Sequence, residues 1–540
     1  MWNAEYRSRA WSELEQPWDI LIIGGGITGA GLFRMAVNAG LRTALVEAQD
    51  FTFGTSSRSS KLVHGGFRYL RNRQFSVTRQ AVREREWLLR EAKHLVNPLS
   101  FFAPGYDDYA PLWQLHLGVI IYDLLALKWD HHRCTKEDLL REYPFLRQTG
   151  LQGACQYWDA HVDDSRLVLR LLREGARRGG LALNYARVER LLRDSNRQVC
   201  GALVRDMAQP NGSALEVRAR LVINASGPWS DALRSQLGAL PRLRKLRGSH
   251  LVFPFEKFPI REAVTLFHPR DRRAMFVIPW ESVTIVGTTD LDHPRELEEQ
   301  QCEPCASPGE IDYLMEAVGT CFPGLGLSHN DVIATFAGLR PVIRSERTTD
   351  PSKESRAHVV WLEDGLLTVT GGKLTTFRIM AAEALQTVAG RLGLRPSAFA
   401  AQQLFDPLPE LPPAVSLSQE TLLYLLGRYG SETSSLLTSA TPDELQPIPG
   451  TPNLWAEIRW AARQEGIQHL DDLLLRRVRI GLLLENGAEA HLERLRSIIQ
   501  PELGWSDIRW SQEVAVYRQI WRNSYSPYPI GYTQCNAEEK

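Results

Sequence analysis

The chain has 540 residues, 44% hydrophobic and 23% charged, a composition typical of a globular protein with two to four domains. Lys plus Arg and Asp plus Glu both number 63, and this balance argues against a general nucleic-acid-binding protein. The seven scattered cysteines are typical of a reducing, cytoplasmic setting. Cys302 and Cys305 form a single C-x-x-C without a second pair, so we predict no metal site.

The first 20 residues lack the apolar stretch of a signal peptide, and the first strand follows them directly. This strand, 19–23, leads into Gly24, Gly26 and Gly29, which supply G-x-G-x-x-G ahead of a helix that ends near residue 39. A second strand ends at Glu47, where a carboxylate can accept hydrogen bonds from ribose hydroxyls. Strand, glycines, helix, strand and acid together predict a dinucleotide site with its pyrophosphate at the helix N-terminus.

The next stretch, 50–70, has no apolar periodicity and is rich in hydroxyls and cations. Its hydroxyls suit the phosphate and ribitol oxygens of an extended cofactor, and they belong to Thr55, Ser56, Ser57, Ser59 and Ser60. We expect the first half of this stretch to hold a cofactor and the second half to reach a substrate.

The most apolar stretch, 111–129, is interrupted by Asp123 and carries Trp near both ends. No run of eighteen apolar residues occurs, so we predict no helix that spans a membrane. We expect 111–129 to be a core helix, and a helix lying at a membrane interface is the alternative.

Two later segments favour FAD over NAD. The strand 221–223 ends in Asn-Ala-Ser-Gly, a pattern that can return the chain to the dinucleotide domain. The stretch 366–378 predicts a strand, a Gly-Gly pair and a helix, which brings a second helix N-terminus to the ligand. Positive potential from that N-terminus suits an anionic reduced flavin.

Beyond these segments the sequence predicts a helical region without chemistry of its own. A proline-rich stretch at 406–413 is typical of a linker. We therefore expect a discontinuous FAD-binding domain with an interleaved substrate domain over 1–395, a linker over 396–415 and helices over 416–540. We expect the basic runs 242–247 and 476–479 to be solvated surface, and Thr451 to cap a helix that starts at Pro452.

These motifs together resemble the FAD-dependent, aerobic-type glycerol-3-phosphate dehydrogenase family, within the D-amino-acid-oxidase-like flavoproteins. The resemblance extends over 19–378 and is carried, in order, by DILIIGGGITGAG, EAQDF, GTSSRSSKLVHGGFRYL, VDDSRLVL, INASGPW, RGSHLVFP, VIPW, VGTTD, FAGLRP and TGGKLTTFR. It implies an α/β fold with a Rossmann-type FAD-binding domain, an interleaved α+β substrate domain and a C-terminal α-helical domain. The family's last motif usually has Tyr where this chain has Phe377.

The resemblance implies a role for individual residues as well. His250 is expected to be the general base, with His64 as the second choice, and Arg340 the main phosphate or alkoxide partner. The other implied substrate-binding residues are Arg68, Tyr69, Arg356 and Lys373. The cofactor-binding residues are expected to be Gly24, Gly26, Gly29, Glu47, Thr55, Ser56, Ser57, Ser60, Lys61, Ala225, Gly227, Gly371, Gly372, Leu374 and Thr375.

The implied reaction is oxidation of sn-glycerol 3-phosphate, with electrons passed to a quinone at the inner face of the membrane. An oxidase of the same fold, reducing oxygen to peroxide, is the main alternative. An amino-acid substrate, a flavin-dependent RNA-modifying enzyme and a non-catalytic flavin-binding regulator also stay open. The resemblance implies peripheral membrane contact and leaves a homodimer open.

Overall fold

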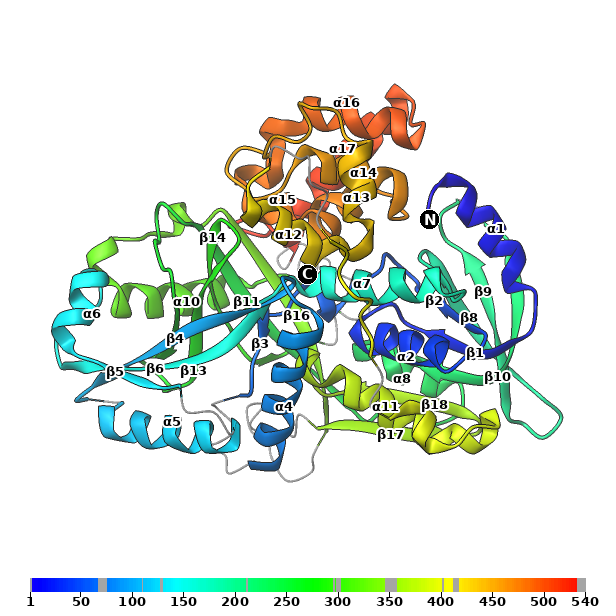
Figure 1. The fold of residues 1–540 in the computed structure, drawn as a ribbon, viewed down its shortest axis with the longest axis horizontal. Helices are drawn as coiled ribbons and strands as arrows, with labels where there is room; N and C mark the ends of the chain where they lie inside the picture. The colour runs from blue at the N-terminus through cyan, green and yellow to red at the C-terminus, as the bar shows by residue number, and fades with distance from the viewer. Residues whose placement is uncertain are drawn as a thin grey trace, which may run out of the picture.

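The computed structural model describes residues 2–66, 75–108, 110–126, 130–209, 212–294, 297, 303–344, 357–400, 403–410 and 417–531. Two sheets lie side by side, and the C-terminal helices cross above both of them (Figure 1). The chain passes between the sheets several times, which confirms the predicted α/β fold with interleaved domains.

The first sheet carries the dinucleotide motif. Its strands run in the order β17, β18, β10, β1, β2, β7, with β8 and β9 attached to β10. The central strands β18, β10, β1, β2 and β7 are parallel, so their carboxyl ends meet at one edge, where an open α/β sheet binds its ligand. The strand bounds are β1 (Trp18–Ile23), β2 (Thr43–Val46), β7 (Leu181–Leu183), β8 (Ala186–Arg193), β9 (Val199–Asp206), β10 (Ala214–Asn224), β17 (His358–Glu363) and β18 (Leu366–Gly371).

The second sheet is mostly antiparallel and lies in the part of the chain where the substrate domain is expected. Its order is β15, β11, β14, β13, β12, β4, β6, β3, and β16 and β5 pair with β11 and β6. The strand bounds are β3 (Leu62–Val63), β4 (Val96–Tyr106), β5 (His132–Cys134), β6 (Leu151–Val162), β11 (Leu243–Pro254), β12 (Ala263–Phe267), β13 (Ala274–Trp280), β14 (Val283–Gly287), β15 (Leu291–Asp292) and β16 (Ala334–Ile343).

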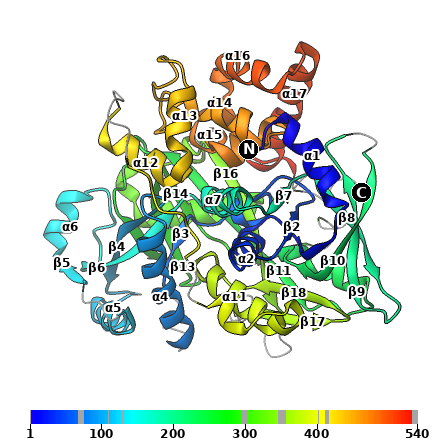
Figure 2. The same cartoon turned by 45° about the vertical axis from the view of Figure 1, so that its right-hand side comes forward.

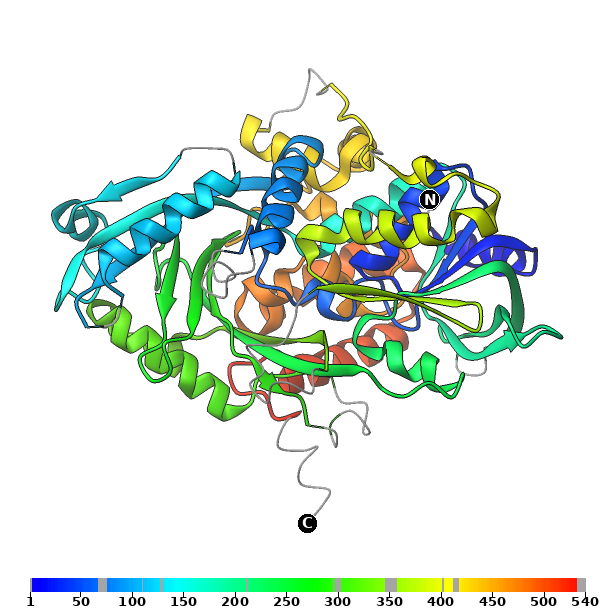
Figure 3. The same cartoon turned by 90° about the horizontal axis from the view of Figure 1, so that it is seen from below.

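Helices cover the two sheets on their outer sides (Figures 1 and 3). Around the first sheet, α2 packs against both α7 and α11. The helices that cover the two sheets are α1 (Ala4–Leu14), α2 (Ile27–Asn38), α4 (Phe75–Glu91), α5 (Leu112–Ala126), α6 (Lys136–Glu142), α7 (Asp164–Arg177), α8 (Ser230–Ser235), α10 (Pro308–Cys321) and α11 (Phe377–Val388).

Helix α5 differs from the core helix expected for 111–129. Its inner face is buried, as Tyr122 shows, but Trp113, Leu117 and Leu124 are 64%, 52% and 60% exposed. These three residues are spaced four and seven positions apart and therefore share one helix face. The prediction of a fully buried helix is wrong, because only one side of α5 meets the second sheet (Figure 1).

The C-terminal helices share a hydrophobic core with strands of the second sheet, among them β11, β14 and β16 (Figure 2). Their bounds are α12 (Gln419–Tyr429), α13 (Thr433–Ser439), α14 (Trp455–Gln464), the π-helix η10 (Asp472–Arg477), α15 (Ile480–Leu483), α16 (Leu492–Leu503) and α17 (Asp507–Ser524). Helix α14 has Leu454 as its N-cap, so the predicted start at Pro452 with Thr451 as cap is wrong. Within the predicted linker, Leu404 and Phe405 are buried, and Asp406 accepts a bond from Arg34 of α2.

The basic run 476–479 is not solvated surface, and that prediction is wrong. Arg476, Arg477 and Arg479 are at most 1% exposed. Both Nη atoms of Arg477 donate to the carboxylate of Asp50 at 2.7 Å, and Arg476 Nε donates to the same group at 2.7 Å. Because the partner Asp50 lies more than 400 positions earlier in the chain, local sequence carries no sign of this burial.

Candidate FAD and substrate site

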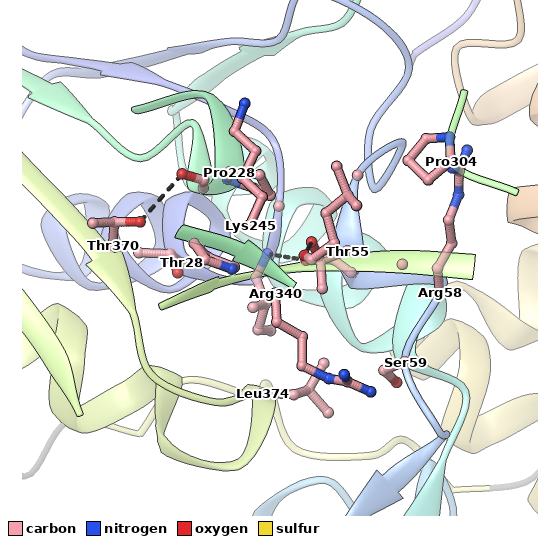
Figure 4. A pocket seen from close by; sticks show the side chains of 18 of the residues that line it. Thr28, Thr55, Arg58, Ser59, Pro228, Lys245, Pro304, Arg340, Thr370 and Leu374 are labelled. Atoms are coloured by element: carbon pink, nitrogen blue, oxygen red, sulfur yellow. Dashed lines mark hydrogen bonds between the residues drawn. The ribbon is translucent and has the colours of Figure 1, made fainter. Parts of the chain in front are cut away.

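A cavity of about 780 Å³ opens along the carboxyl edge of the first sheet and extends to β11 and β16 of the second. The glycine turn after β1, the 53–64 stretch, 225–229 and 370–375 all line it. Figure 4 shows Thr28 and Thr370 in one part of the cavity, and Arg340 beside Leu374 and Ser59 in another. One continuous cavity thus joins the predicted dinucleotide motif to the predicted substrate residues.

The turn after β1 needs glycine at two positions, because a side chain at either one would clash with the backbone. A Cβ on Gly24 would lie 2.5 Å from the carbonyl oxygen of Ala225, and Gly24 has φ of +118°. A Cβ on Gly29 would lie 1.9 Å from the carbonyl oxygen of Gly24, so this glycine lets α2 pack against the turn. The N-cap Gly26 has no side chain of its own to cap α2, and Ser56 Oγ accepts from Ile27 N at 2.9 Å. Gly26, Ile27 and Thr28 line the cavity, so the positive end of the helix faces it.

Glu47 lines the cavity at the end of β2, as predicted. Its Oε2 accepts a bond from Gly25 N at 2.6 Å and its Oε1 accepts one from Gln49 N at 2.9 Å. Burial raises the pKa of this carboxyl, against the lowering effect of those two bonds. The carboxylate therefore also fixes the glycine turn on which a dinucleotide would rest.

His250, the expected general base, lines the cavity from β11. Its Nε2 lies 2.8 Å from Ser60 Oγ, and its ring stacks on Phe336 with centroids 4.5 Å apart. Burial, and after it the positive charges of Arg340 and Lys61, hold the pKa of His250 well below its usual range. The imidazole is therefore neutral near pH 7 and able to accept a proton.

Arg340 lies on β16 and lines the same part of the cavity. Its Nη1 donates to Asp290 Oδ1 at 3.0 Å and its Nη2 donates to Thr288 Oγ1 at 2.7 Å. These bonds fix the plane of the guanidinium, which keeps an exposed side toward the cavity, with 22% of the side chain accessible. A fixed guanidinium of this kind is suited to bind an oxyanion.

Comparison with known proteins agrees with this geometry. Residues 19–378 match the model of the FAD dependent oxidoreductase family, and 376–510 match the C-terminal domain of alpha-glycerophosphate oxidase. The glycerol-3-phosphate dehydrogenase of Mycobacterium leprae is 34% identical, over 95% of this chain and 90% of its own length. The aerobic glycerol-3-phosphate dehydrogenase of Staphylococcus epidermidis is 34% identical, over 85% of this chain and 86% of its own.

This chain belongs to the FAD-dependent glycerol-3-phosphate dehydrogenase family. The solved structure of the Bacillus halodurans glycerol-3-phosphate dehydrogenase complexed with FAD has a TM-score of 0.77 and 26% identity, and the match covers 98% of this chain and 99% of that one. The L-alpha-glycerophosphate oxidase of Mycoplasma pneumoniae, 15% identical with a TM-score of 0.55 over 73% of this chain and 100% of its own, shares the fold. Membership confirms the predicted family, fold class and FAD cofactor.

The hydroxyls of the 55–61 loop have partners within the protein. Thr55 donates to the Leu339 carbonyl, Ser56 accepts from Ile27 N at 2.9 Å, and Ser59 donates to Asp164 at 2.7 Å. Thr55, Ser56 and Ser60 line the cavity, yet each already has a protein partner. The hydroxyls therefore help to hold the loop in shape, and their contact with the cofactor stays a prediction.

Ser57 and Lys61 are not among the cavity-lining residues. Lys61 Nζ is fully buried and donates to the Ser57 carbonyl at 2.6 Å and to both oxygens of Asp164. The structure places both residues behind the cavity wall, so a cofactor would not touch the ammonium of Lys61. Burial lowers the pKa of Lys61 to about 7, with Arg479 adding to the effect.

The remaining expected residues divide into two groups. One group lines the cavity: Gly227, Ala225, Gly371, Gly372, Lys373, Leu374, Thr375 and His64. The predicted Gly-Gly pair ends β18 and leads into a short 3₁₀ turn and α11, as expected from the sequence. Arg68, Tyr69 and Arg356 lie outside the described residues, and so does Cys302.

Sequence reasoning missed several residues that line the cavity. Arg58 lies inside the serine-rich loop and forms an ion pair with Glu303, whose Oε1 also accepts a bond from Tyr525 at 2.8 Å. Lys245 lines the cavity from β11, although its run, 242–247, was expected to be solvated. Lys245 and His250 are five positions apart on β11, so strand alternation from His250 does not identify Lys245 as a cavity residue.

Proposed function

We propose that the protein oxidises sn-glycerol 3-phosphate to dihydroxyacetone phosphate. The observation that supports this most is that His250 and Arg340 line the same cavity as the FAD cradle. A secondary alcohol that carries a phosphate needs a proton acceptor and a cation, and these two side chains supply both chemistries. Bound FAD would supply the hydride acceptor.

Arg340 would bind the phosphate or the developing alkoxide of the substrate. Asp290 and Thr288 hold its guanidinium in one orientation, so little conformational entropy is lost when an anion arrives. Lys373 lines the cavity beside the Gly-Gly turn and would add a second positive charge. An anionic substrate would offset the repulsion between these two cations.

His250 would take the proton from the C2 hydroxyl. It is neutral before substrate binds, and a dianionic substrate nearby would raise its pKa toward the range that suits a general base. The bond between Ser60 Oγ and Nε2 orients the ring. His64, which also lines the cavity, is the second candidate for this role.

The experiment is an anaerobic absorption spectrum of the purified holoprotein before and after addition of sn-glycerol 3-phosphate. Rapid loss of the oxidised flavin band is expected, followed by its return when a soluble quinone is added. Fast return with air instead would identify an oxidase. A flavin band that does not change with this substrate, or that bleaches as fast with an amino acid as the control, would contradict the proposed reaction.

We propose further that electrons pass to a membrane quinone and that α5 makes the membrane contact. In the described part of the chain, no helix is both long enough and apolar enough to cross a membrane. The outer face of α5 exposes Trp113, Leu117 and Leu124, a pattern suited to a helix lying in the lipid headgroup region.

Sedimentation with anionic phospholipid vesicles tests this contact. The double variant Leu117→Glu/Leu124→Glu should sediment much less than the native protein, because two charges would enter the acyl boundary. Leu240→Glu is the matched control, since Leu240 is 80% exposed but lies away from α5. Equal loss of sedimentation in both variants would contradict a role for α5.

A further inference from the structure

Gly65, next to the cavity-lining His64, is in contact with helix α5. Its backbone N–H donates to Tyr122 Oη at 3.0 Å and to Asp159 Oδ1 at 3.1 Å. A Cβ at this position would lie 2.3 Å from Tyr122 Oη and 2.4 Å from Val82 Cγ2. Only glycine therefore allows the turn to approach α5 this closely.

The partners of Gly65 form a closed and buried cluster. Tyr122 Oη donates to Asp159 Oδ1 at 2.6 Å, and Arg85 Nη1 donates to the same oxygen at 2.7 Å. Arg85, Tyr122 and Asp159 are at most 4% exposed. Burial and the adjacent Asp159 charge raise the pKa of Tyr122 well above its usual range, so its hydroxyl stays protonated.

The cluster joins three elements that are distant in sequence. Arg85 lies on α4, Tyr122 on α5 and Asp159 on β6. Tyr122 and Asp159 accept from the amide that follows His64, and Arg85 donates to both of these acceptors. Simple packing would need no charge here, since burial of an ion pair gains little stability over an apolar cluster. A buried carboxylate with three donors does, however, fix the direction of each donor.

We infer that Asp159, with Tyr122 and Arg85, positions the His64–Gly65 turn and thereby connects helix α5 to the catalytic cavity. These three are positioning residues, since they act through the Gly65 amide and not on the substrate. The inference rests on the proposed function only for the kinetic part of its test.

The test compares Tyr122→Phe with the matched control Tyr157→Phe. Tyr157 is another fully buried tyrosine, whose ring packs edge-on against Tyr122 with centroids 6.0 Å apart, and its hydroxyl bonds to Thr265 Oγ1 at 2.7 Å. The first readout is hydrogen exchange of the amides of 62–66 in both holoproteins. Exchange at Gly65 should rise at least about tenfold in Tyr122→Phe and stay unchanged in Tyr157→Phe.

The second readout is the rate of flavin bleaching at saturating sn-glycerol 3-phosphate. It should fall about tenfold in Tyr122→Phe with FAD content unchanged, because a small displacement of a residue beside the reacting atoms slows the reaction. Asp159→Asn should move both readouts in the same direction.

Exchange and bleaching that change no more in Tyr122→Phe than in Tyr157→Phe would overturn the inference. If Tyr122→Phe does not fold, Arg85→Lys decides on the same criteria, since lysine keeps the charge but not the fixed fork. If the native protein is not bleached by the substrate, the proposed function fails, and the exchange experiment still decides this inference.

Discussion

At the scale of single residues, Arg340 has two measurable effects on one site. It offers a cation to the substrate, and its charge helps to hold the pKa of His250 low. We expect Arg340→Met to raise KM for sn-glycerol 3-phosphate by about 10- to 100-fold, since a charge-assisted hydrogen bond contributes about 1.5–3 kcal/mol. FAD content should stay the same.

The same variant should alter the pH dependence of kcat/KM. A general base works in its deprotonated form, so activity falls as the pH drops through its pKa. Removal of the Arg340 charge raises the pKa of His250, and the acid limb should therefore move to higher pH. Arg273→Met is the control, because Arg273 pairs with the same Asp290 but does not line the cavity.

Gly24 provides a second prediction at this scale. Gly24→Ala should abolish FAD retention, because the new Cβ would lie 2.5 Å from the Ala225 carbonyl oxygen. Gly179→Ala is the matched control, since Gly179 has φ of +94° but no atom within 4 Å of the added Cβ. It should lose about 1–3 kcal/mol of stability through backbone strain and keep its flavin. The ratio of flavin to protein absorbance measures FAD retention in both variants. A full flavin content in Gly24→Ala would contradict the predicted clash with the Ala225 carbonyl oxygen.

At the scale of elements, Glu281 connects the β13–β14 hairpin to α12. Its Oε2 accepts a bond from Tyr424 Oη at 2.9 Å. Burial raises the pKa of Glu281 to about 7, and the nearby Arg428 only partly opposes this effect. The carboxyl ionises near pH 4.5 when exposed, so between about pH 4.5 and 7 the native state holds a proton that the unfolded chain has lost.

Native stability should therefore fall as the pH rises through this window. We expect Glu281→Gln to remove up to about 3 kcal/mol of that decline, as measured by urea unfolding at pH 5 and pH 8. Glu383→Gln, at an exposed carboxylate, is the control and should leave the decline in place. An equal decline in Glu281→Gln and the native protein would show that Glu281 is ionised throughout.

The elements also show what the sequence could and could not predict. The strand, glycine turn and helix of 19–39 were predicted because their signal is local: spacing, turn glycines and hydrophobic runs. The sequence does not show which protein groups bind the hydroxyls of 55–60, because those partners, such as Leu339 and Asp164, lie far along the chain. Helix α5 was taken as a core helix because its composition does not show that one face meets no other element.

At the scale of the whole molecule, the C-terminal helices and the FAD-binding region share buried charges. Arg477 and Asp50 are both fully buried. Arg477→Met should lower the stability by about 3–5 kcal/mol, because it leaves a buried carboxylate without one of its partners. The double variant Asp50→Asn/Arg477→Met should lose less than the single one, since the unpaired charge is gone.

Thermal unfolding of the holoprotein measures both variants. Arg494→Met is the control, because Arg494 and its partner Asp443 form an exposed pair worth less than about 1 kcal/mol. If the stability lost in the double variant equalled the losses of Asp50→Asn alone and Arg477→Met alone added together, the two residues would not be acting as a pair.

The buried arginines also determine when the cofactor site can form during synthesis. Arg479 donates to the Ser57 carbonyl at 2.8 Å, and Arg476 and Arg477 neutralise Asp50, so residues made near the end of translation complete a loop made near its start. A ribosome delivers the N-terminal part first. The nascent chain can fold the glycine turn early, but the loop beside it lacks its counter-charges until roughly nine-tenths of the chain has emerged. Flavin loading is therefore a late step, so a chain that stops before residue 476 should be released as an apoprotein and cleared by proteases.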